Sequence, residues 1–171
     1  MIFLGIGSNL NSKFGNRFFN IKKTLDLILD EKMKIKKKSS YYETPSYPNT
    51  EDPKFINIVI EIEFNLNPEN LLKKILLIEK KMERIRNFKN EPRTCDIDII
   101  DFNGMIISKK NIDLPHPKSH ERNFVLFPLK EICPKWIHPI INKEIDVLIK
   151  NLPTKTRNEI TRVKESAILE K

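Results

Sequence analysis

Two aspartates near the middle of the chain are the residues best suited to chemistry. Asp96 and Asp98 stand one residue apart in the apolar segment 94–100. In a β-strand, both carboxylates would share one face while Cys95, Ile97 and Ile99 face the core. Neighbouring carboxylates repel unless a cation lies between them, and a ligand set of oxygens alone suits Mg²⁺ better than zinc. The pair therefore indicates a magnesium site for phosphate chemistry, although it is also typical of an edge strand with a solvated polar face.

Arginines flank this pair in the sequence. Arg93 precedes the predicted strand, and Arg84 and Arg86 stand just before a charged segment, 87–91, that leads to it. A guanidinium presents a planar fork of donors that matches a phosphate group. The three arginines predict a phosphate clamp, although arginines at a helix end more often form surface salt bridges worth under about 1 kcal/mol.

A second constellation suits a flat heterocycle. Segment 55–64 alternates apolar and other residues, so its isoleucines face the core and Phe55 and Asn57 share the opposite face. An aromatic plane beside an amide favours stacking and edge recognition, although a partly covered Phe with a turn-forming Asn fits the same pattern. His116 and Arg122 follow the aspartates and add positive charge to the polyphosphate hypothesis.

The elements that must position these residues follow from periodicity and capping signals. The glycine-containing segment 5–10 is interpreted as a turn, because its spacing matches neither the dinucleotide nor the Walker fingerprint. Asn103-Gly104 predicts a tight turn with 105–108 returning as the partner strand. The sequence predicts strands over 1–6, 35–44, 55–64 and 96–102, helices over 16–29, 67–85, 119–127 and 142–152, a proline-rich loop over 45–53, and irregular chain over 128–139.

Length and charge bound the class of protein. The 171 residues suit one domain, residues 1–152, with a polar extension, 153–171, that is loose or a short surface helix. The net charge of +8 raises nucleic acid as a partner, but the charge is spread along the chain, and a polyanionic small molecule explains it equally well. No segment is long and apolar enough for a membrane span, and we expect a cytoplasmic protein. One disulfide between Cys95 and Cys133 is conceivable, but a free buried thiol is the commoner state of a cysteine on the apolar side of a strand.

Taken in order, these motifs resemble the 6-hydroxymethyl-7,8-dihydropterin pyrophosphokinase family of folate biosynthesis over about residues 1–150. The most specific block is Pro92-Arg93-Thr94-Cys95-Asp96-Ile97-Asp98. The other matching segments are Gly5 to Leu10, Tyr42 to Pro45, Phe55 to Asn57, Arg84 to Arg86, Pro115 to Pro117 and Arg122 to Leu129.

The resemblance implies an α+β fold, a single-domain sandwich with a ferredoxin-like core and a central, mostly antiparallel sheet flanked by helices. It implies transfer of diphosphate from ATP to the pterin's hydroxymethyl group, with release of AMP. Two Mg²⁺ ions would be held by Asp96 and Asp98, with Arg84 and Arg93 also catalytic. The segments 45–53 and 87–91 would act as lids. The implied ATP-binding residues are Glu79, Arg84, Arg93, Ile99 through its backbone, His116 and Arg122; the implied pterin-binding residues are Thr44, Pro45, Phe55, Asn57 and Phe124.

Two other functions fit parts of the sequence. A small basic α+β module could bind single-stranded RNA by stacking bases on Phe55 and Phe124. The second alternative is a relative of the family that binds a pterin but has lost transfer activity. The expectation that agrees with the ordered motifs is a monomeric enzyme whose partners are ATP and 6-hydroxymethyl-7,8-dihydropterin, with no nucleic acid and no membrane.

Overall fold

The computed structural model describes residues 1–85 and 91–164, so Arg86 and the lid residues 87–90 lie outside the described part. Its helices and strands alternate irregularly along the chain. In order they are β1 (Ile2–Ser8), α1 (Arg17–Asp30), β2 (Lys34–Lys38), β3 (Tyr42–Thr44), β4 (Phe55–Glu63), α2 (Pro68–Lys81), β5 (Asp96–Phe102), β6 (Ile107–Lys109), β7 (Ile112–Leu114), the 3₁₀-helix η1 (Ser119–Glu121), α3 (Asn123–Ile132), α4 (Ile145–Asn151), α5 (Thr154–Asn158) and β8 (Thr161–Arg162).

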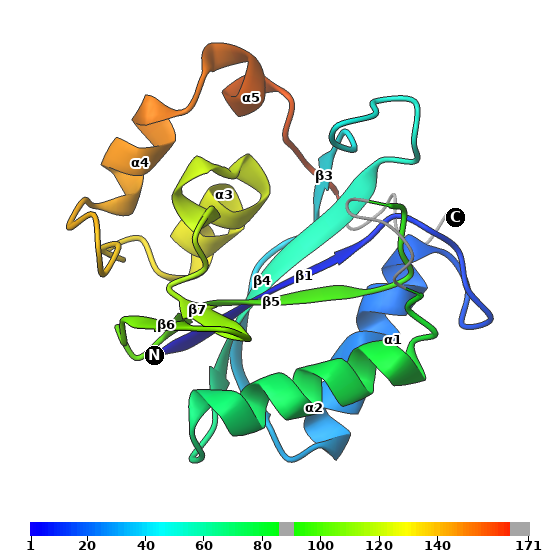
Figure 1. Cartoon of the computed structure of the whole chain (residues 1–171). Coiled ribbons are helices and arrows are strands. Elements are labelled where there is room, and N and C mark those ends of the chain that lie inside the picture. Colours follow the sequence, from blue (N-terminus) through cyan, green and yellow to red (C-terminus); the bar gives the residue numbers. More distant parts are fainter. Residues whose placement is uncertain (86–90, 165–171) are drawn as a thin grey trace.

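One antiparallel sheet organises the chain. Its strands lie in the order β5-β1-β4-β3-β8, and β2 pairs with the remaining length of β4. Helices α1 and α2 cover one face, and α3 and α4 cover the other (Figure 1). The predicted α+β class, a mostly antiparallel sheet flanked by helices, is confirmed.

Alternation along the strands gives each face its own core. The isoleucines of β4, with Ile97 and Ile99 of β5, pack against α1 and α2. On the other face, Phe3, Val59 and Ile100 pack against α3 and α4. Because the second face also carries glycines and polar residues at one end of the strands, it leaves room for a site there.

The two long helices begin where the capping signals predict. The Asn16 side chain accepts hydrogen bonds from the backbone of Phe18 and Phe19 at the start of α1. Asn67 caps α2 in the same way, with Pro68 in its first turn. The predicted extension of α2 to residue 85 is wrong, because the chain leaves the helix after Lys81 and Ile85 is 69% exposed.

Three other predicted segments differ from the structure. The weak strand 35–44 is two separate strands, β2 and β3. Residues 103 and 104 turn with positive φ, but the returning strand β6 pairs with β7 instead of β5. Helix α3 continues through Pro128 to Ile132, because its buried apolar stripe outweighs the hydrogen bond that proline cannot donate.

The chain continues beyond α4 along the second face. Helix α5 follows Pro153, and β8 then pairs with β3 at the sheet edge. Within residues 1–85 and 91–164, no helix has both the length and the apolar character to span a membrane.

Candidate active site

The two aspartates lie where the alternation of β5 places them. Asp96 and Asp98 share the face opposite Ile97 and Ile99, and their side chains are 25% and 34% exposed. Burial, and then the nearby Asp96, raise the pKa of Asp98 to about 6. The two carboxylates therefore form a strained like-charge pair at the end of the strand.

Glu79 on helix α2 and Arg84, which follows the end of that helix, anchor the first carboxylate. Arg84 Nη1 lies 2.6 Å from Asp96 Oδ1 and also pairs with Glu79. The buried Glu79 accepts a hydrogen bond from the backbone of Ile97 at 2.9 Å. Burial would lower the pKa of Arg84, but Asp96 and Glu79 together raise it. The guanidinium is thus a fixed positive charge beside the aspartate pair.

Arg93 joins the carboxylate end of the site to its aromatic end. Its Nη1 lies 3.3 Å from Asp96 Oδ2, and its guanidinium carbon lies 5.4 Å from the ring centre of Phe55. The buried Arg93 Nε has no hydrogen-bond partner in the described part of the chain. Arg93 therefore holds one buried donor that no described group uses.

His116 and Arg122 close the other side of Asp98. Arg122 Nη1 donates to Asp98 Oδ2 at 3.3 Å, and His116 Nε2 lies 3.8 Å from the same oxygen. Burial and Arg122 lower the pKa of His116 to about 4, so the imidazole is neutral at pH 7. Its Nδ1 accepts from the backbone of Lys118, which leaves the proton on Nε2, the nitrogen that faces Asp98.

The predicted heterocycle platform lies on the same face. Phe55 is partly buried, and Asn57 is 6% exposed and donates to Thr44 Oγ1 at 3.1 Å. Pro45 follows Thr44 at the start of the 45–53 loop, and Phe124 at the start of α3 lies 5.4 Å from the guanidinium of Arg122. Ile99 is different, because its side chain lies in the core and only its backbone is free to contact a ligand.

Gly7 connects the two halves of the site, and the sequence interpretation missed its role. Gly5 and Gly7 lie within β1, so the turn predicted over 5–10 is wrong for them. Gly7 pairs with Asn57 on one side and with Asp96 on the other. A Cβ at Gly7 would lie 2.8 Å from Asn57 Oδ1. Glycines at alternate positions of a strand were the signal that one face must stay open.

Asn9 was also missed. Its side chain donates to Ser46 Oγ and to the Pro53 carbonyl, and it accepts from the backbone N–H of Arg93 at 2.7 Å. This single buried amide ties the 45–53 loop to the arginine that precedes β5. Nothing in its sequence context distinguished it from a turn residue.

The residues present suit Mg²⁺. The aspartates offer oxygen ligands only, and burial together with the nearby Asp96 raises the pKa of Asp98, an unfavourable charge that a divalent cation would offset. No group of three or more His, Cys, Asp or Glu side chains that could hold a metal occurs in the described residues. A site with two protein carboxylates is typical of Mg²⁺ held jointly with substrate phosphates.

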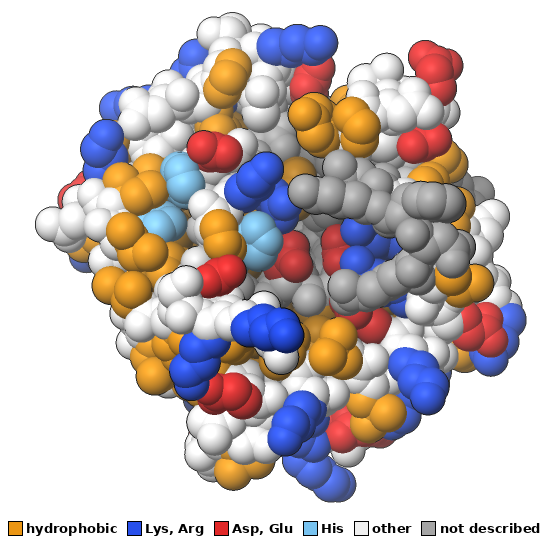
Figure 2. All heavy atoms as spheres, viewed as in Figure 1, with side chains coloured by type: hydrophobic (Ala, Val, Ile, Leu, Met, Phe, Trp, Pro, Cys, Tyr) orange, Lys and Arg blue, Asp and Glu red, His pale blue; other side chains and the backbone are white. Residues whose placement is uncertain are grey.

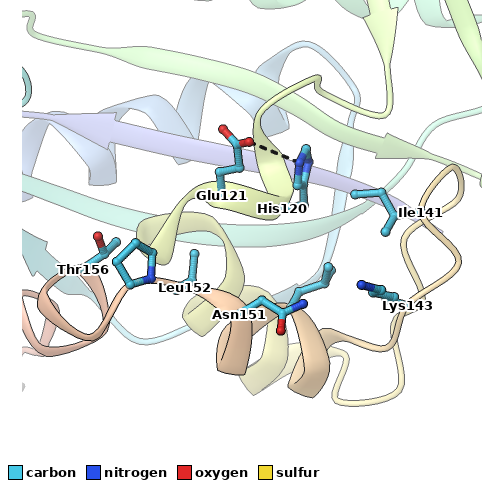
Figure 3. Close-up of a pocket in the computed structure, with 9 residues that line it drawn as sticks. His120, Glu121, Ile141, Lys143, Asn151, Leu152 and Thr156 are labelled. Atoms are coloured by element: carbon cyan, nitrogen blue, oxygen red, sulfur yellow. Dashed lines mark ion pairs between the residues drawn. The ribbon is translucent and has the colours of Figure 1, made fainter.

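Figure 2 shows acidic and basic side chains side by side in a hollow of this face, with histidines beside it. A separate cavity of about 480 Å³ lies between η1 and helices α4 and α5 (Figure 3). His120, Leu152 and Thr156 are among its lining residues, and none of the predicted site residues lines it. The predicted site is therefore the carboxylate and arginine cluster and not this cavity.

The fold and the cluster define an α+β protein with a paired-carboxylate, arginine-rich candidate site, a combination of side chains that suits phosphates. Residues 3–134 match the model of the 7,8-dihydro-6-hydroxymethylpterin-pyrophosphokinase (HPPK) family. The chain is 37% identical over 144 residues to 2-amino-4-hydroxy-6-hydroxymethyldihydropteridine pyrophosphokinase of Aquifex aeolicus, covering 84% of this chain and 87% of that protein. It is 36% identical to the Bacillus subtilis protein of the same name, covering 77% of each. The chain belongs to the 7,8-dihydro-6-hydroxymethylpterin-pyrophosphokinase family, which confirms the enzyme class predicted from the sequence.

Longer proteins match as well. The chain is 38% identical to the folic acid synthesis protein FOL1 of Dictyostelium discoideum, covering 90% of this chain but only 22% of that protein. Among solved structures, Plasmodium falciparum HPPK-DHPS wild type with SDX-DHP has a TM-score of 0.67 at 17% identity, covering 94% of this chain and 46% of that one. HPPK-DHPS in complex with substrates gives 0.68 at 15% identity, covering 94% and 46%. These structures support the fold alone.

Proposed function

We propose that this chain transfers the terminal diphosphate of ATP to the hydroxymethyl oxygen of 6-hydroxymethyl-7,8-dihydropterin in a Mg²⁺-dependent reaction that releases AMP. The observation that carries the proposal is one row of residues across three strands. Asn57, Gly7 and Asp96 are successive partners on β4, β1 and β5. Neighbouring strands lie about 4.8 Å apart, so a ring at Asn57 and a phosphate at Asp96 are held within reach of each other.

The basic residues would bind and orient the triphosphate. Arg84 and Arg93 reach Asp96, and Arg122 reaches Asp98, so each carboxylate has a guanidinium beside it. Neutral His116 would donate its Nε2 proton to a phosphate oxygen. Positioning and neutralisation of charge carry most of the catalysis in phosphoryl transfer, which explains a site rich in arginine and without a strong base.

Asp96 and Asp98 would hold the Mg²⁺, with two ions expected. The bound metal would supply positive charge to the phosphates and to the attacking oxygen. Before it binds, the guanidinium groups partly balance the carboxylates, which keeps the pair on one face in spite of its repulsion. Glu79 would orient Arg84 from beneath the strand.

The aromatic end would bind the pterin. Phe55 and Phe124 would stack on the ring, and Asn57 with the backbone around Thr44 and Pro45 would read its polar edge. Asn57 is held by Thr44 at one hydrogen-bond position, so its amide is already oriented. Asn9, through Ser46 and the Pro53 carbonyl, would couple the 45–53 lid to Arg93 and exclude water from the reacting phosphate.

The decisive experiment incubates the protein with ATP, Mg²⁺ and 6-hydroxymethyl-7,8-dihydropterin and measures AMP by chromatography. AMP should form only when pterin and Mg²⁺ are both present. AMP formation without pterin would indicate simple hydrolysis, and binding of pterin without AMP would indicate a relative that has lost transfer. Salt-dependent binding of single-stranded RNA without any Mg²⁺ requirement would favour the RNA-binding alternative.

Variants of the two aspartates test whether these residues carry the reaction. Asp96→Ala and Asp98→Ala should each lower turnover by at least about 1000-fold, because electrostatic stabilisation of the transferring group is the main catalytic contribution. Asp146→Ala is the matched control, since Asp146 lies on α4 and pairs with Lys130. Full activity in either of the first two variants would contradict the metal assignment.

The cellular setting also remains a proposal. We infer a monomeric enzyme of the cytoplasm that acts on small molecules and binds neither nucleic acid nor membrane. The two free thiols support a reducing compartment, and burial raises the pKa of Cys95 to about 12, so that thiol is unreactive.

A further inference from the structure

The part of the chain after α4 contacts the two elements that flank the predicted pterin site, strand β3 and the start of helix α3. It lies beyond residues 3–134, which match the family model. We propose that residues 153–163, here called the C-terminal strap, position the pterin-binding walls and thereby set pterin affinity. This inference rests on the proposed function and assigns the strap a role in one half of the site only.

The first attachment is to strand β3. In the strap, β8 pairs with β3 so that Arg162 lies opposite Tyr42 and Thr161 lies opposite Glu43. The backbone N–H of Val163 donates to the Tyr41 carbonyl at 2.8 Å. Strand β3 pairs on its other side with β4, where Tyr42 lies opposite Asn57. The strap is thus separated from the pterin platform by a single three-residue strand.

The Arg162 side chain strengthens this attachment. Its Nε donates to Ser40 Oγ at 2.9 Å, and its Nη2 lies 3.4 Å from Glu131 Oε1 on α3. Glu131 also accepts from the Ser40 backbone at 3.1 Å and from Tyr42 Oη at 2.9 Å. One carboxylate therefore joins the strap, the chain before β3, β3 itself and α3.

The second attachment is at the opposite wall. Asn123 Nδ2 donates to the Thr156 carbonyl at 2.6 Å, and Asn123 is 6% exposed. The next residue is Phe124, the predicted stacking partner on α3. Figure 1 shows the strap passing from α4 through α5 to the edge of the sheet, and Figure 3 labels Thr156 beside the cavity described above.

The physical need for such a strap follows from the length of β3. A three-residue edge strand gains few hydrogen bonds, and without β8 its outer backbone groups would face water. Thr44, which orients Asn57, is the last residue of this strand. Pairing on both sides of β3 holds Thr44 in place before the 45–53 loop begins. The pterin-binding residues are then ordered before the ligand arrives, and binding costs less conformational entropy.

The test uses the full chain with Arg162→Ala and with the double change Arg162→Ala and Val163→Pro. The proline removes the N–H that bonds to Tyr41. We expect the KM for 6-hydroxymethyl-7,8-dihydropterin at saturating ATP to rise roughly three- to tenfold, as for the loss of one or two hydrogen bonds. The KM for ATP should stay within about twofold of the parent, because in the described part of the chain the strap forms no hydrogen bond or ion pair with Arg84, Arg93 or Arg122.

Arg157→Ala is the matched control. Arg157 also lies in the strap, but its guanidinium bonds only to Thr154 in the described structure. Arg162→Lys should recover part of the pterin affinity, since it keeps a charge near Glu131. The thermal unfolding midpoint of every variant is measured to show which variants fold. If the double variant does not fold, the pterin KM of Arg162→Ala alone tests the inference.

Two results would overturn the inference. One is an unchanged pterin KM in Arg162→Ala and in the folded double variant, and the other is an equal rise in the KM for ATP and for pterin. Both presuppose a parent chain that makes AMP. Failure of the parent to do so would refute the proposed function instead, and the two failures are therefore distinguishable.

Discussion

At the scale of single residues, the site carries an electrostatic cost that the proposed binding of Mg²⁺ would explain. Asp98 has a pKa of about 6 because of burial and of Asp96, so its charged form is disfavoured in the folded chain. The sign follows from linkage, since a carboxyl whose pKa is raised on folding destabilises the fold once it ionises. This cost is absent below the ordinary pKa of 3.8 and fully present above about 6.

Asp98→Asn should therefore make the metal-free protein more stable while removing turnover. We expect a gain of about 1 kcal/mol in the free energy of unfolding at pH 8, after allowance for solvent screening of a side chain that is 34% exposed. Urea denaturation at pH 8 and at pH 3.5 measures it, and the gain should vanish at the lower pH. Asp146→Asn serves as the exposed control, and a loss of stability at pH 8 in Asp98→Asn would contradict the assigned repulsion.

The sequence predicted the charged residues of the site better than the residues that keep the site open or hold its parts together. Alternation along 96–102 placed both aspartates on one face, and the flanking arginines were close enough in sequence to be assigned to them. Gly7 and Asn9 were missed because their roles depend on partners 50 and 84 residues away, Asn57 and Arg93. Residues that keep a site open contribute no chemical group, so only the fold reveals them.

The variant Gly7→Ala tests whether the space left open at Gly7 is needed for pterin binding. The added methyl would lie 2.8 Å from Asn57 Oδ1 and would displace the amide that we propose reads the pterin edge. We expect the pterin KM to rise about tenfold, as for the loss of a buried hydrogen bond worth about 1.4 kcal/mol. Gly5→Ala is the matched control, because its new methyl would lie 3.4 Å from Ile100 Cδ1, an ordinary contact. Equal effects of the two variants on pterin KM would refute the role of Gly7.

At the scale of elements, local signals located the helix starts and the central strands. They failed where long-range packing decides the outcome. The segment after Asn103-Gly104 has the turn of a hairpin, yet β6 pairs with β7 because the chain must return along β5, where the His116 N–H donates to the Ile100 carbonyl. The strand β8 carries no apolar alternation, because its place is fixed by β3 and by Glu131.

Glu131→Gln should weaken the junction between α3 and β3 in a pH-dependent way. Burial would raise the pKa of Glu131, but hydrogen bonds from Ser40 and Tyr42 lower it overall. A lowered pKa stabilises the fold above the ordinary value of 4.5 and loses that effect as the pH falls below it. We expect a loss of about 1 kcal/mol in unfolding free energy at pH 7 that shrinks toward zero by pH 3, measured by urea denaturation. A loss that is the same at both pH values would show that the charge plays no part.

At the scale of the whole molecule, the basic charge has a structural use besides the proposed phosphate binding. No described strand pairs with the outer side of β2, which carries exposed Lys34, Lys36, Lys37 and Lys38. An open strand edge invites pairing with a second molecule, and lysines along it oppose that pairing because two such edges repel. Glu61 and Glu63 on β4 balance the row within the chain without covering its outer side.

The chain should consequently sediment as a 20.2 kDa monomer at neutral pH, and the lysines of β2 should be responsible. In the triple variant Lys34→Thr, Lys36→Thr and Lys38→Thr, the strand keeps its β propensity but loses the repulsion, so we expect dimers or larger species at concentrations where the parent is monomeric. The matched control removes three exposed lysines elsewhere, Lys22, Lys135 and Lys150, and keeps the same net charge as the triple variant. If both variants associate equally, net charge alone keeps the molecules apart; if only the first does, the edge of β2 is the protected surface.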